Sequence, residues 1–292
     1  MKGIIDRILT VFAWFCGACV VLIVLGILGF LLRRGFRTLN ADLFFGDTHW
    51  IEAVTGTKPV FDGIWPAAAG TFLLVALSAS LAIPVGVASG IHITQYASGR
   101  IRAVLDFLVD LLSGTPSIVM GLFGFTLILA LRKMLSLEAR PSLFLASGCI
   151  ALLVLPYVIR TTQSALDGIP EHLRLLGCTL GFSPWCSTRH ILLPLAGRGI
   201  LSGAALAIGR AAEDTAVILL AGVAAHAGLP HTLSDKFEAL PFRIYYLTAE
   251  HQNEAQLNQA FGTALVLMCI TTSLLCLSIS LQRKLEKRWS FR

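Results

Sequence analysis

Long apolar segments constrain this chain more than any other feature of its sequence. A helix needs about 20 consecutive apolar residues to cross the roughly 30 Å of hydrocarbon in a bilayer. Six segments reach that length: roughly residues 9–32, 66–93, 104–131, 142–162, 198–222 and 259–282. The sequence therefore predicts an all-α fold, a polytopic integral membrane bundle of six transmembrane helices.

Charged residues are scarce and unevenly placed. They make up 14% of the 292 residues, against about a quarter in a typical soluble domain, which excludes a cytosolic enzyme. Many basic residues lie at the ends of the apolar segments, where they suit lipid headgroups better than nucleic acid. These clusters are Arg33, Arg34 and Arg37, then Arg100 and Arg102, then Arg283, Lys284, Lys287 and Arg288.

An even number of spans places both termini on one side of the membrane. The basic residues favour the cytoplasmic side by a small margin, carried mainly by the tail of residues 283–292. The first segment follows Lys2 and Arg7, as in a signal peptide, but it is too long for one and no clean cleavage site follows. We therefore interpret it as a retained anchor.

Residues 163–197 form an unusual connection, because leucines and helix signals alternate with polar residues. Pro170 and Glu171 indicate the start of a short helix that closes at Gly181. A docking knob outside the bilayer and an amphipathic segment lying on the headgroups fit this pattern equally well.

A second short helix is expected in the same connection. Ser183 and Pro184 have the residue types of an N-cap and a first helical residue. We expect this helix to end near Leu193 and Pro194.

Arg210 lies near the middle of the fifth apolar segment, where a charged side chain costs about 2.5 to 3.5 kcal/mol. Glu213 and Asp214 follow at helical spacing, so an ion pair within one helix is available. The pair has two interpretations: it neutralises itself while packing the bundle, or it lines a route on which Arg210 meets a transient anion. A guanidinium suits phosphate because its planar donors match two oxygens.

Other charged residues, and the prolines and a glycine within the spans, also have two interpretations. Arg160 is either a second pathway cation or a side chain that reaches the interface. Asp106 and Asp110 have the i,i+4 spacing of a paired-carboxylate site, but we expect solvated anchors near the start of the third span. Pro84, Gly114 and Pro116 are helix breaks that serve a pathway or kinks that serve packing.

The seven cysteines show no disulfide framework. Cys16 and Cys19 form C-x-x-C, but no βαβ context, second pair or nearby histidine accompanies them, so we expect small lipid- or helix-facing residues and no metal site. No Walker A sequence occurs, so the chain is not expected to hydrolyse ATP itself.

Five motifs follow one another in this chain. Gly181, a gap of nine residues and I-L-L-P at 191–194 form one. The others are G-T at 70–71 with A-I-P-V-G-V at 82–87 and Q-Y-A at 95–97, S-G-T-P-S-I-V-M-G-L-F at 113–123, L-P at 155–156 with R-T-T at 160–162, and G-R-A-A-E-D-T-A at 209–216. Their order and spacing resemble the bacterial ABC-transporter permeases with an EAA loop, the binding-protein-dependent transport permeases, and within them the PstA-type phosphate permeases.

The resemblance implies a type I ABC importer permease fold. Residues 1–65 would be the first transmembrane helix and outer loop, 66–282 the permease core with its coupling loop at about 163–197, and 283–292 a basic cytoplasmic tail. The chain would form half of the pathway of an ATP-driven phosphate importer in the bacterial cytoplasmic (inner) membrane. Sulfate, molybdate or tungstate are alternative substrates. The resemblance implies no cofactor in this chain, since ATP and Mg are bound by a partner ATPase.

The implied partners are a second permease (PstC-like), two copies of an ATPase (PstB-like) and an external phosphate-binding protein (PstS-like), together with the lipid bilayer and no nucleic acid. Site residues follow position by position. The substrate pathway would comprise Arg160, Arg210, Glu213, Asp214 and Thr215. The ATPase coupling loop would comprise Leu175, Leu176, Gly177, Gly181, Ile191, Leu193 and Pro194.

The chain departs from the family pattern at several of these positions. Leu175-Leu176-Gly177 stands where the family has E-A-A, so its usual acidic contact is absent, and Gln163 stands where a glutamate is frequent. Glu213, Asp214 and Val217 replace a glycine, a glutamate and a proline. Two other function classes stay open: an ion-coupled carrier using Arg210 and Asp214, and a membrane enzyme, for which no nucleophile-base or metal constellation is found.

Overall fold

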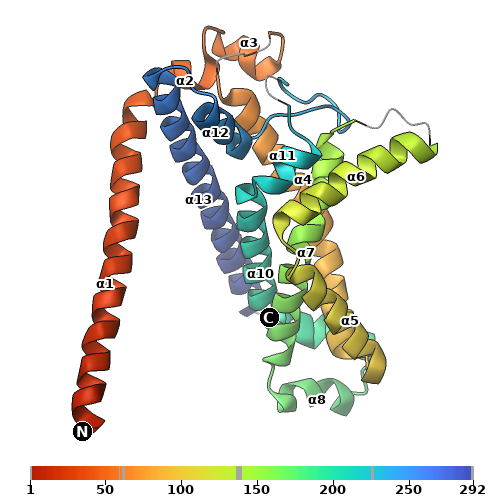
Figure 1. The fold of residues 1–292 in the computed structure, drawn as a ribbon. Helices are drawn as coiled ribbons and strands as arrows, with labels where there is room; N and C mark the ends of the chain where they lie inside the picture. The colour runs from red at the N-terminus through yellow and green to blue at the C-terminus, as the bar shows by residue number, and fades with distance from the viewer. Residues whose placement is uncertain (1, 59, 61–62, 136–139, 225–226, 291–292) are drawn as a thin grey trace.

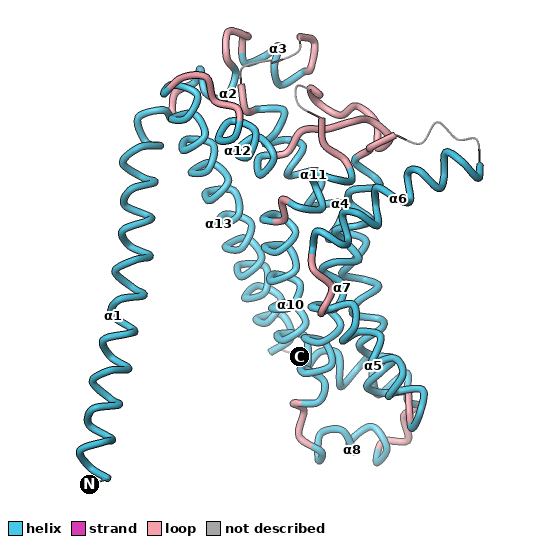
Figure 2. Tube along the Cα trace, viewed as in Figure 1, coloured by secondary structure: helices cyan, strands magenta, loops and turns pink. Residues whose placement is uncertain are grey.

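The computed structural model of the chain is built from helices (Figures 1 and 2). It describes residues 2–58, 60, 63–135, 140–224 and 227–290. The elements are α1 (Lys2–Gly35), η1 (Phe36–Thr38), α2 (Ala41–Phe45), α3 (Trp50–Thr55), α4 (Trp65–Ile91), η2 (His92–Tyr96), α5 (Gly99–Ser113), α6 (Ser117–Leu135), α7 (Leu143–Asp167), α8 (Glu171–Thr179), α9 (Pro184–Ser187), η3 (Thr188–Leu192), α10 (Leu193–Glu213), α11 (Ala216–Ala221), α12 (Leu240–Ala249) and α13 (Glu254–Ser290).

Among the described residues, five helical segments are long and apolar enough to cross a membrane. They are Ile5–Thr38, Trp65–Tyr96, Leu143–Asp167, Pro184–Glu213 and Glu254–Ser280. Helices α5 and α6 form a sixth span if they are taken together, and they are bent by 95° at their junction. This arrangement confirms the prediction of an all-α membrane bundle.

Helices α4, α7 and α10 form the centre of the bundle, and glycines set how closely they approach. A Cβ on Gly86 of α4 would lie 2.7 Å from the Val158 side chain of α7. On α10, a Cβ on Gly203 would lie 1.8 Å from Oγ1 of Thr161. Small residues let transmembrane helices pack backbone to backbone, which lipid alone does not drive. Helix α7 is therefore covered on both sides.

The G-T motif at 70–71 anchors the connection before α12. A Cβ on Gly70 would lie 2.0 Å from the carbonyl oxygen of Glu238, so only glycine lets this segment pass. Oγ1 of Thr71 donates to the Ala67 carbonyl at 2.8 Å and accepts the N–H of Leu240 at 2.8 Å. The motif thus fixes the connection on top of α4.

The same connection covers the start of α7. The N–H of Leu143 donates to the carbonyl of Asp235 at 3.1 Å. The Asp235 carboxylate accepts the backbone N–H groups of Thr232 and His231 at 2.8 and 3.0 Å. Two hydrogen bonds from Thr232 hold the pKa of the Asp235 carboxyl below its ordinary value, and the bond from the Thr232 side chain has a larger effect than the bond from its backbone.

Helix α1 stands at the edge of the molecule (Figure 1). None of the most apolar window of its span is buried within this chain. It meets α13 at its far end, where the rings of Phe30 and Phe261 lie edge to face with centroids 5.5 Å apart. Cys16 is exposed and Cys19 half-buried on this helix, as expected for small lipid- or helix-facing residues. No group of three metal-ligating side chains occurs among the described residues.

The expected helix breaks have mixed outcomes. Gly114 and Pro116 lie between α5 and α6, where the chain turns by 95°. Pro84 does not break its span, because α4 runs through it from Trp65 to Ile91. A break that the sequence did not predict divides the fifth span at Asp214 and Thr215, between α10 and α11.

The N-terminus, α8 and the end of α13 lie toward the same end of the molecule (Figure 1). The basic tail predicted at 283–292 continues α13 as far as Ser290. Residues 291–292 and the side chains of 284–290 lie outside the described part of the chain.

Candidate functional site

The break between α10 and α11 brings Arg210 and Asp214 together. The Asp214 side chain is 2% exposed and lies 3.7 Å from Nη2 of Arg210, measured from its Oδ2. Its Oδ1 accepts the N–H of Val217 at 2.9 Å. The carboxylate thus caps the first turn of α11 while it faces the guanidinium. Arg210 lies in the last turn of α10, so the expectation that it sits mid-span in an unbroken helix is wrong.

The other predicted members of this group lie differently. Glu213 is exposed at the end of α10, and Thr215 is half-buried in the break. Among the described contacts, the ion pair of Arg210 is made with Asp214 and not with Glu213. A separation of 3.7 Å exceeds hydrogen-bond length, so the 40%-exposed Arg210 side chain keeps donor capacity for another acceptor.

Helix α6 packs directly on the break. A Cβ on Gly121 would lie 2.9 Å from the Ala216 carbonyl, and one on Gly124 would lie 3.0 Å from Cβ of Ala221. The motif at 113–123 and the motif at 209–216 are therefore neighbours in space. Two interrupted spans meet here, α5–α6 and α10–α11, and interrupted helices expose backbone groups where a transporter holds its substrate.

Arg160 belongs to a different cluster, between α7 and α5. Its Nη1 donates to Oδ1 of Asp106 and to Oε1 of Gln163, both at 2.9 Å, and its Nη2 also bonds to the Asp110 carboxylate. Nε2 of Gln163 donates to the same Asp106 oxygen at 2.9 Å. The interpretation of Asp106 and Asp110 as solvated anchors omitted this pairing: the Asp110 side chain is 66% exposed, but one arginine binds both carboxylates.

This cluster continues to the connection that was expected to dock a partner. Arg102 lies 3.8 Å from both Asp106 and Asp167. Asp167, at the end of α7, lies 3.5 Å from Arg174 of α8. Arg174 also donates to the carbonyl of Leu166. A chain of alternating charges thus joins α8, the end of α7 and α5.

Sequence reasoning did not link these residues. The i,i+4 spacing of Asp106 and Asp110 was the available signal, since it puts both carboxylates on one face of α5. Their partner is 50 residues or more away in the chain. The described contacts do not join Arg160 to Arg210, so the two arginines predicted for the pathway belong to separate clusters.

The first half of the connection at 163–197 agrees with the expectation. Helix α8 begins at Glu171, after Pro170. It ends in a turn where Gly181 has a φ of +70°, Phe182 N–H donates to the Gly177 carbonyl at 2.9 Å and Gly181 N–H donates to the Cys178 carbonyl at 3.1 Å. This pair of bonds is a Schellman motif, in which glycine avoids the strain of the left-handed conformation.

The second half differs from the expectation. Oγ of Ser183 accepts the N–H of Cys186 at 3.3 Å, so the predicted N-cap is confirmed. The helix does not end near Leu193 and Pro194, however, but continues to Glu213. The π-helical turn at Thr188–Leu192, which Ile191 belongs to, explains this. Its wider hydrogen-bond spacing admits a proline that has no N–H to donate.

Helix α8 and the turn after it expose a large apolar surface. Gly177 faces α9, since a Cβ there would lie 2.2 Å from Oγ of Ser187. Large side chains that are exposed on this knob are Leu175, Leu176, Leu180, Phe182 and Trp185. A gathering of exposed apolar side chains outside the apolar spans indicates a protein or membrane contact.

Comparisons with known proteins agree on one family. The model of the family described as "Binding-protein-dependent transport system inner membrane component" matches residues 82–291. The chain is 30% identical over 227 residues to "Phosphate transport system permease protein PstA 1" of Mycobacterium tuberculosis (strain CDC 1551 / Oshkosh). This alignment covers 77% of this chain and 73% of that protein. The chain is 30% identical over 250 residues to "Phosphate transport system permease protein PstA" of Haemophilus influenzae, covering 85% and 82%.

A solved structure shows the same fold. It is the crystal structure of a bacterial alginate ABC transporter in complex with alginate pentasaccharide-bound periplasmic protein. One of its chains matches with a TM-score of 0.64 and 15% sequence identity, covering 94% of this chain and 96% of that one. At this identity the likeness concerns the fold alone.

Proposed function

The chain belongs to the family of binding-protein-dependent transport system inner membrane components, and from this we propose that it forms half of the translocation pathway of an inorganic phosphate importer. It is a multi-pass, non-catalytic permease subunit of an ABC importer in the inner membrane. The similarity to phosphate permeases over most of the chain supports phosphate as the substrate.

The proposal of an anion pathway rests on the contacts of the Arg210 guanidinium. Its guanidinium lies at a helix break, outside hydrogen-bond distance of a carboxylate that is itself held by the N–H of Val217. A phosphate that arrives can take the open donors of the guanidinium in a bidentate geometry. When it leaves, Asp214 again balances the charge. The carboxylate thus lowers the cost of an empty site and opposes overly tight binding.

Glu213 and Thr215 extend this proposed pathway. Glu213 adds negative charge at the same break, which favours release of an anion. The Thr215 hydroxyl supplies a neutral donor. Arg160 is proposed to act at the other end of the route, where its ion pairs with Asp106 and Asp110 hold α5 against α7. Opening of these pairs would let α5 move.

The knob formed by α8, the turn at Gly181 and α9 is proposed to dock an ATPase subunit. Its exposed apolar side chains, Leu175 and Leu176 among them, replace the acidic contact of the E-A-A segment. In this arrangement both termini and the knob face the cytoplasm. Ile191, Leu193 and Pro194 transmit motion, because they lie in the helical segment Pro184–Glu213 that leads to Arg210.

The remaining partners follow from the importer architecture. A second, PstC-like permease would complete the pathway, two PstB-like ATPases would bind ATP and Mg, and a PstS-like protein would deliver phosphate at the outer face. We propose residues 1–65 as the first span with its outer loop, 66–282 as the permease core and 283–292 as the cytoplasmic tail. Helix α1, unburied in the single chain, offers its surface to lipid or to the second permease.

Uptake by the complex reconstituted in vesicles tests this proposal. We expect Arg210→Gln to leave the complex assembled and to reduce phosphate uptake by at least about tenfold, since a bidentate, charge-assisted contact is lost. Lys133→Gln, at the exposed end of α6, removes the same charge and should have no effect. Normal uptake by Arg210→Gln would contradict the role of Arg210.

Competition identifies the substrate. Excess unlabelled phosphate should suppress uptake of labelled phosphate, whereas sulfate and molybdate should not. Stronger competition by either of those anions would reassign the substrate. Uptake by the purified chain without an ATPase would instead indicate an ion-coupled carrier.

A further inference from the structure

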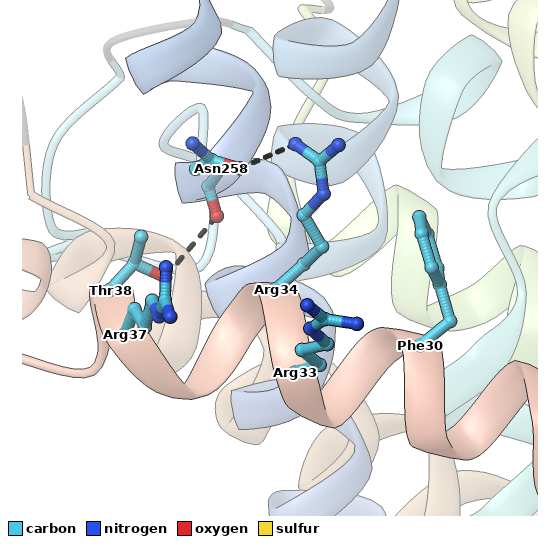
Figure 3. Close-up of a pocket in the computed structure, with 6 residues that line it drawn as sticks. All are labelled: Phe30, Arg33, Arg34, Arg37, Thr38 and Asn258. Carbon is cyan, nitrogen blue, oxygen red and sulfur yellow. Dashed lines mark hydrogen bonds between the residues drawn. The ribbon is translucent and has the colours of Figure 1, made fainter.

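Three arginines surround a cavity at the outer end of α1, far along the chain from the proposed pathway. The cavity has a volume of about 450 Å³ and lies where α1 and η1 meet α13 (Figure 3). Its lining residues are Phe30, Arg33, Arg34, Arg37, Thr38 and Asn258. Two helices thus build the walls, and α1 with η1 supplies all of the positive charge.

Only part of this charge is balanced within the chain. Nη1 of Arg34 lies 3.4 Å from Oδ1 of Asn258 and 3.5 Å from Oε2 of Glu254, whose side chain is 80% exposed. In the part of the chain that the structure describes, Arg33 and Arg37 have no hydrogen-bond or ion-pair partner. They are four residues apart at the end of a helix, a spacing at which like charges repel. The unpaired guanidinium groups of Arg33 and Arg37 therefore keep donors with which they can bind an anion.

The polar wall of the cavity is held in place by the helix junction. Oγ1 of Thr38 donates to the Gly35 carbonyl at 2.8 Å. It also donates to the Asn258 carbonyl at 3.2 Å (Figure 3). A Cβ on Gly35 would lie 2.7 Å from the carbonyl of Phe261, so the two helices touch here. The backbone that carries the three arginines is therefore held against α13, and we call this junction of α1, η1 and α13 the corner.

The cavity lies at a boundary between apolar and polar surfaces. Below it, α1 exposes an uninterrupted apolar surface, and Phe30 forms one wall. The Arg34 guanidinium lies 5.9 Å from the centroid of the Phe30 ring. An anionic group held here would sit at headgroup depth, with apolar helix surface beside it.

We propose that this corner is a binding site for a phosphate group, held by Arg33 and Arg37 with Arg34 in support. Guanidinium groups match phosphate oxygens in pairs, and a cavity of this size admits the headgroup phosphate of an anionic phospholipid or a free inorganic phosphate. The lipid is the favoured source because the adjoining α1 surface takes its acyl chains. The site is independent of the proposed transport function and requires only that α1 spans the membrane.

Lipid retention tests the first source. The full-length chain is reconstituted in phosphatidylcholine nanodiscs with a minor share of phosphatidylglycerol, and the lipid that stays bound after detergent extraction is counted by native mass spectrometry. Wild type should retain phosphatidylglycerol, and Arg33→Gln/Arg37→Gln should retain at least about tenfold less. The matched control, Lys58→Gln/Lys236→Gln, removes two cations from the same side and should retain the wild-type amount.

Equilibrium binding of radiolabelled inorganic phosphate to the same proteins, free of anionic lipid, tests the second source. Phosphate binding that is lost in the Arg33→Gln/Arg37→Gln variant and that phosphatidylglycerol does not displace would assign the site to free phosphate. Arg33→Lys/Arg37→Lys, which keeps the charge but not the paired donors, should restore part of the retention and shows that the corner is folded. Equal lipid retention and equal phosphate binding in wild type and the glutamine variant would overturn the proposal.

Discussion

Arg160 shows how the position of one side chain changes the meaning of a sequence motif. On the sequence alone it lies in R-T-T, a motif shared with permeases, and is either a second pathway cation or a side chain that reaches the interface. In the structure two carboxylates and an amide oxygen already occupy its donors. A substrate would have to displace these groups, so Arg160 acts first as a connector of α5 and α7. Arg210, at 3.7 Å from its carboxylate, keeps more donor capacity.

Removal of Arg160 should therefore destabilise the fold more than removal of either acid. Arg160→Gln leaves Asp110 without its ion pair and leaves Asp106 with only the longer contact to Arg102, at an expected cost of about 1 kcal/mol for these partly exposed groups. Asp110→Asn, at a side chain that is 66% exposed, should cost less. Thermal unfolding of the purified variants in detergent measures which substitution destabilises the protein more.

The double variant Arg160→Gln/Asp106→Asn completes the comparison. Because the two residues share one interaction, its effect should be smaller than the sum of the single effects. Lys133→Gln, which lies outside the cluster, serves as the control. Strict additivity, or equal stability of Arg160→Gln and wild type, would mean that the cluster does not hold α5 to α7.

Among the helices, the features that depend on residues a few positions apart in the chain were predicted from the sequence. The start of α8, the turn at Gly181 and the Ser183 cap follow from residue types a few positions apart, and all three were predicted. The continuation through Pro194 and the break at Asp214 were not. The first depends on a π-helical turn that no residue type marks. The second depends on a buried side chain capping α11, which in sequence resembles an intrahelical ion pair.

Gly181 provides an element-scale test. Its φ of +70° disfavours any Cβ, although no atom lies within 4 Å of the position that a Cβ would take. Gly181→Ala should therefore cost about 1 kcal/mol through backbone strain alone and loosen the knob. Gly148→Ala is a matched control, since its Cβ also meets open space but its backbone is helical. That change should be neutral or slightly stabilising.

Two measurements separate strain from docking in the Gly181 variant. Thermal unfolding of the chain reports the strain, and the amount of ATPase that co-purifies with the chain reports the knob. We expect Gly181→Ala to lower both and Gly148→Ala to lower neither. If equal amounts of ATPase co-purify with both variants, the turn at Gly181 does not contribute to the docking surface.

The whole molecule consists of a glycine-packed centre, α4, α7 and α10, with more loosely attached elements around it. Helix α1 contacts the rest through its C-terminal end, and α8 is connected to the bundle by the ion chain of Arg174, Asp167 and Arg102. The sequence predicted six spans because hydrocarbon thickness sets their length; among the described residues five are continuous, and α5 with α6 makes a sixth only if the bent pair is one span. The sequence did not predict the ion chain, since long-range pairing has no periodic signature.

Asp167 is the link through which a movement of α8 reaches α5, since its two oxygens lie 3.5 Å from Arg174 and 3.8 Å from Arg102. Its side chain is half-exposed, so Asp167→Asn should change stability by less than about 1 kcal/mol. Transmission between the knob and the bundle should suffer more. In the reconstituted complex, we expect the phosphate imported per ATP hydrolysed to fall severalfold while ATP hydrolysis itself continues.

Glu171→Gln is the matched control for this prediction, because it removes an equal charge from the exposed first turn of α8 and should leave the ratio unchanged. Asp167→Glu, which retains a carboxylate near both arginines, should recover part of the coupling. A ratio that stays at the wild-type value in Asp167→Asn would show that α8 moves the bundle through the continuous helix Pro184–Glu213 alone. A parallel loss of hydrolysis and uptake would place the defect in ATPase docking, because the ion chain acts after docking and before transport.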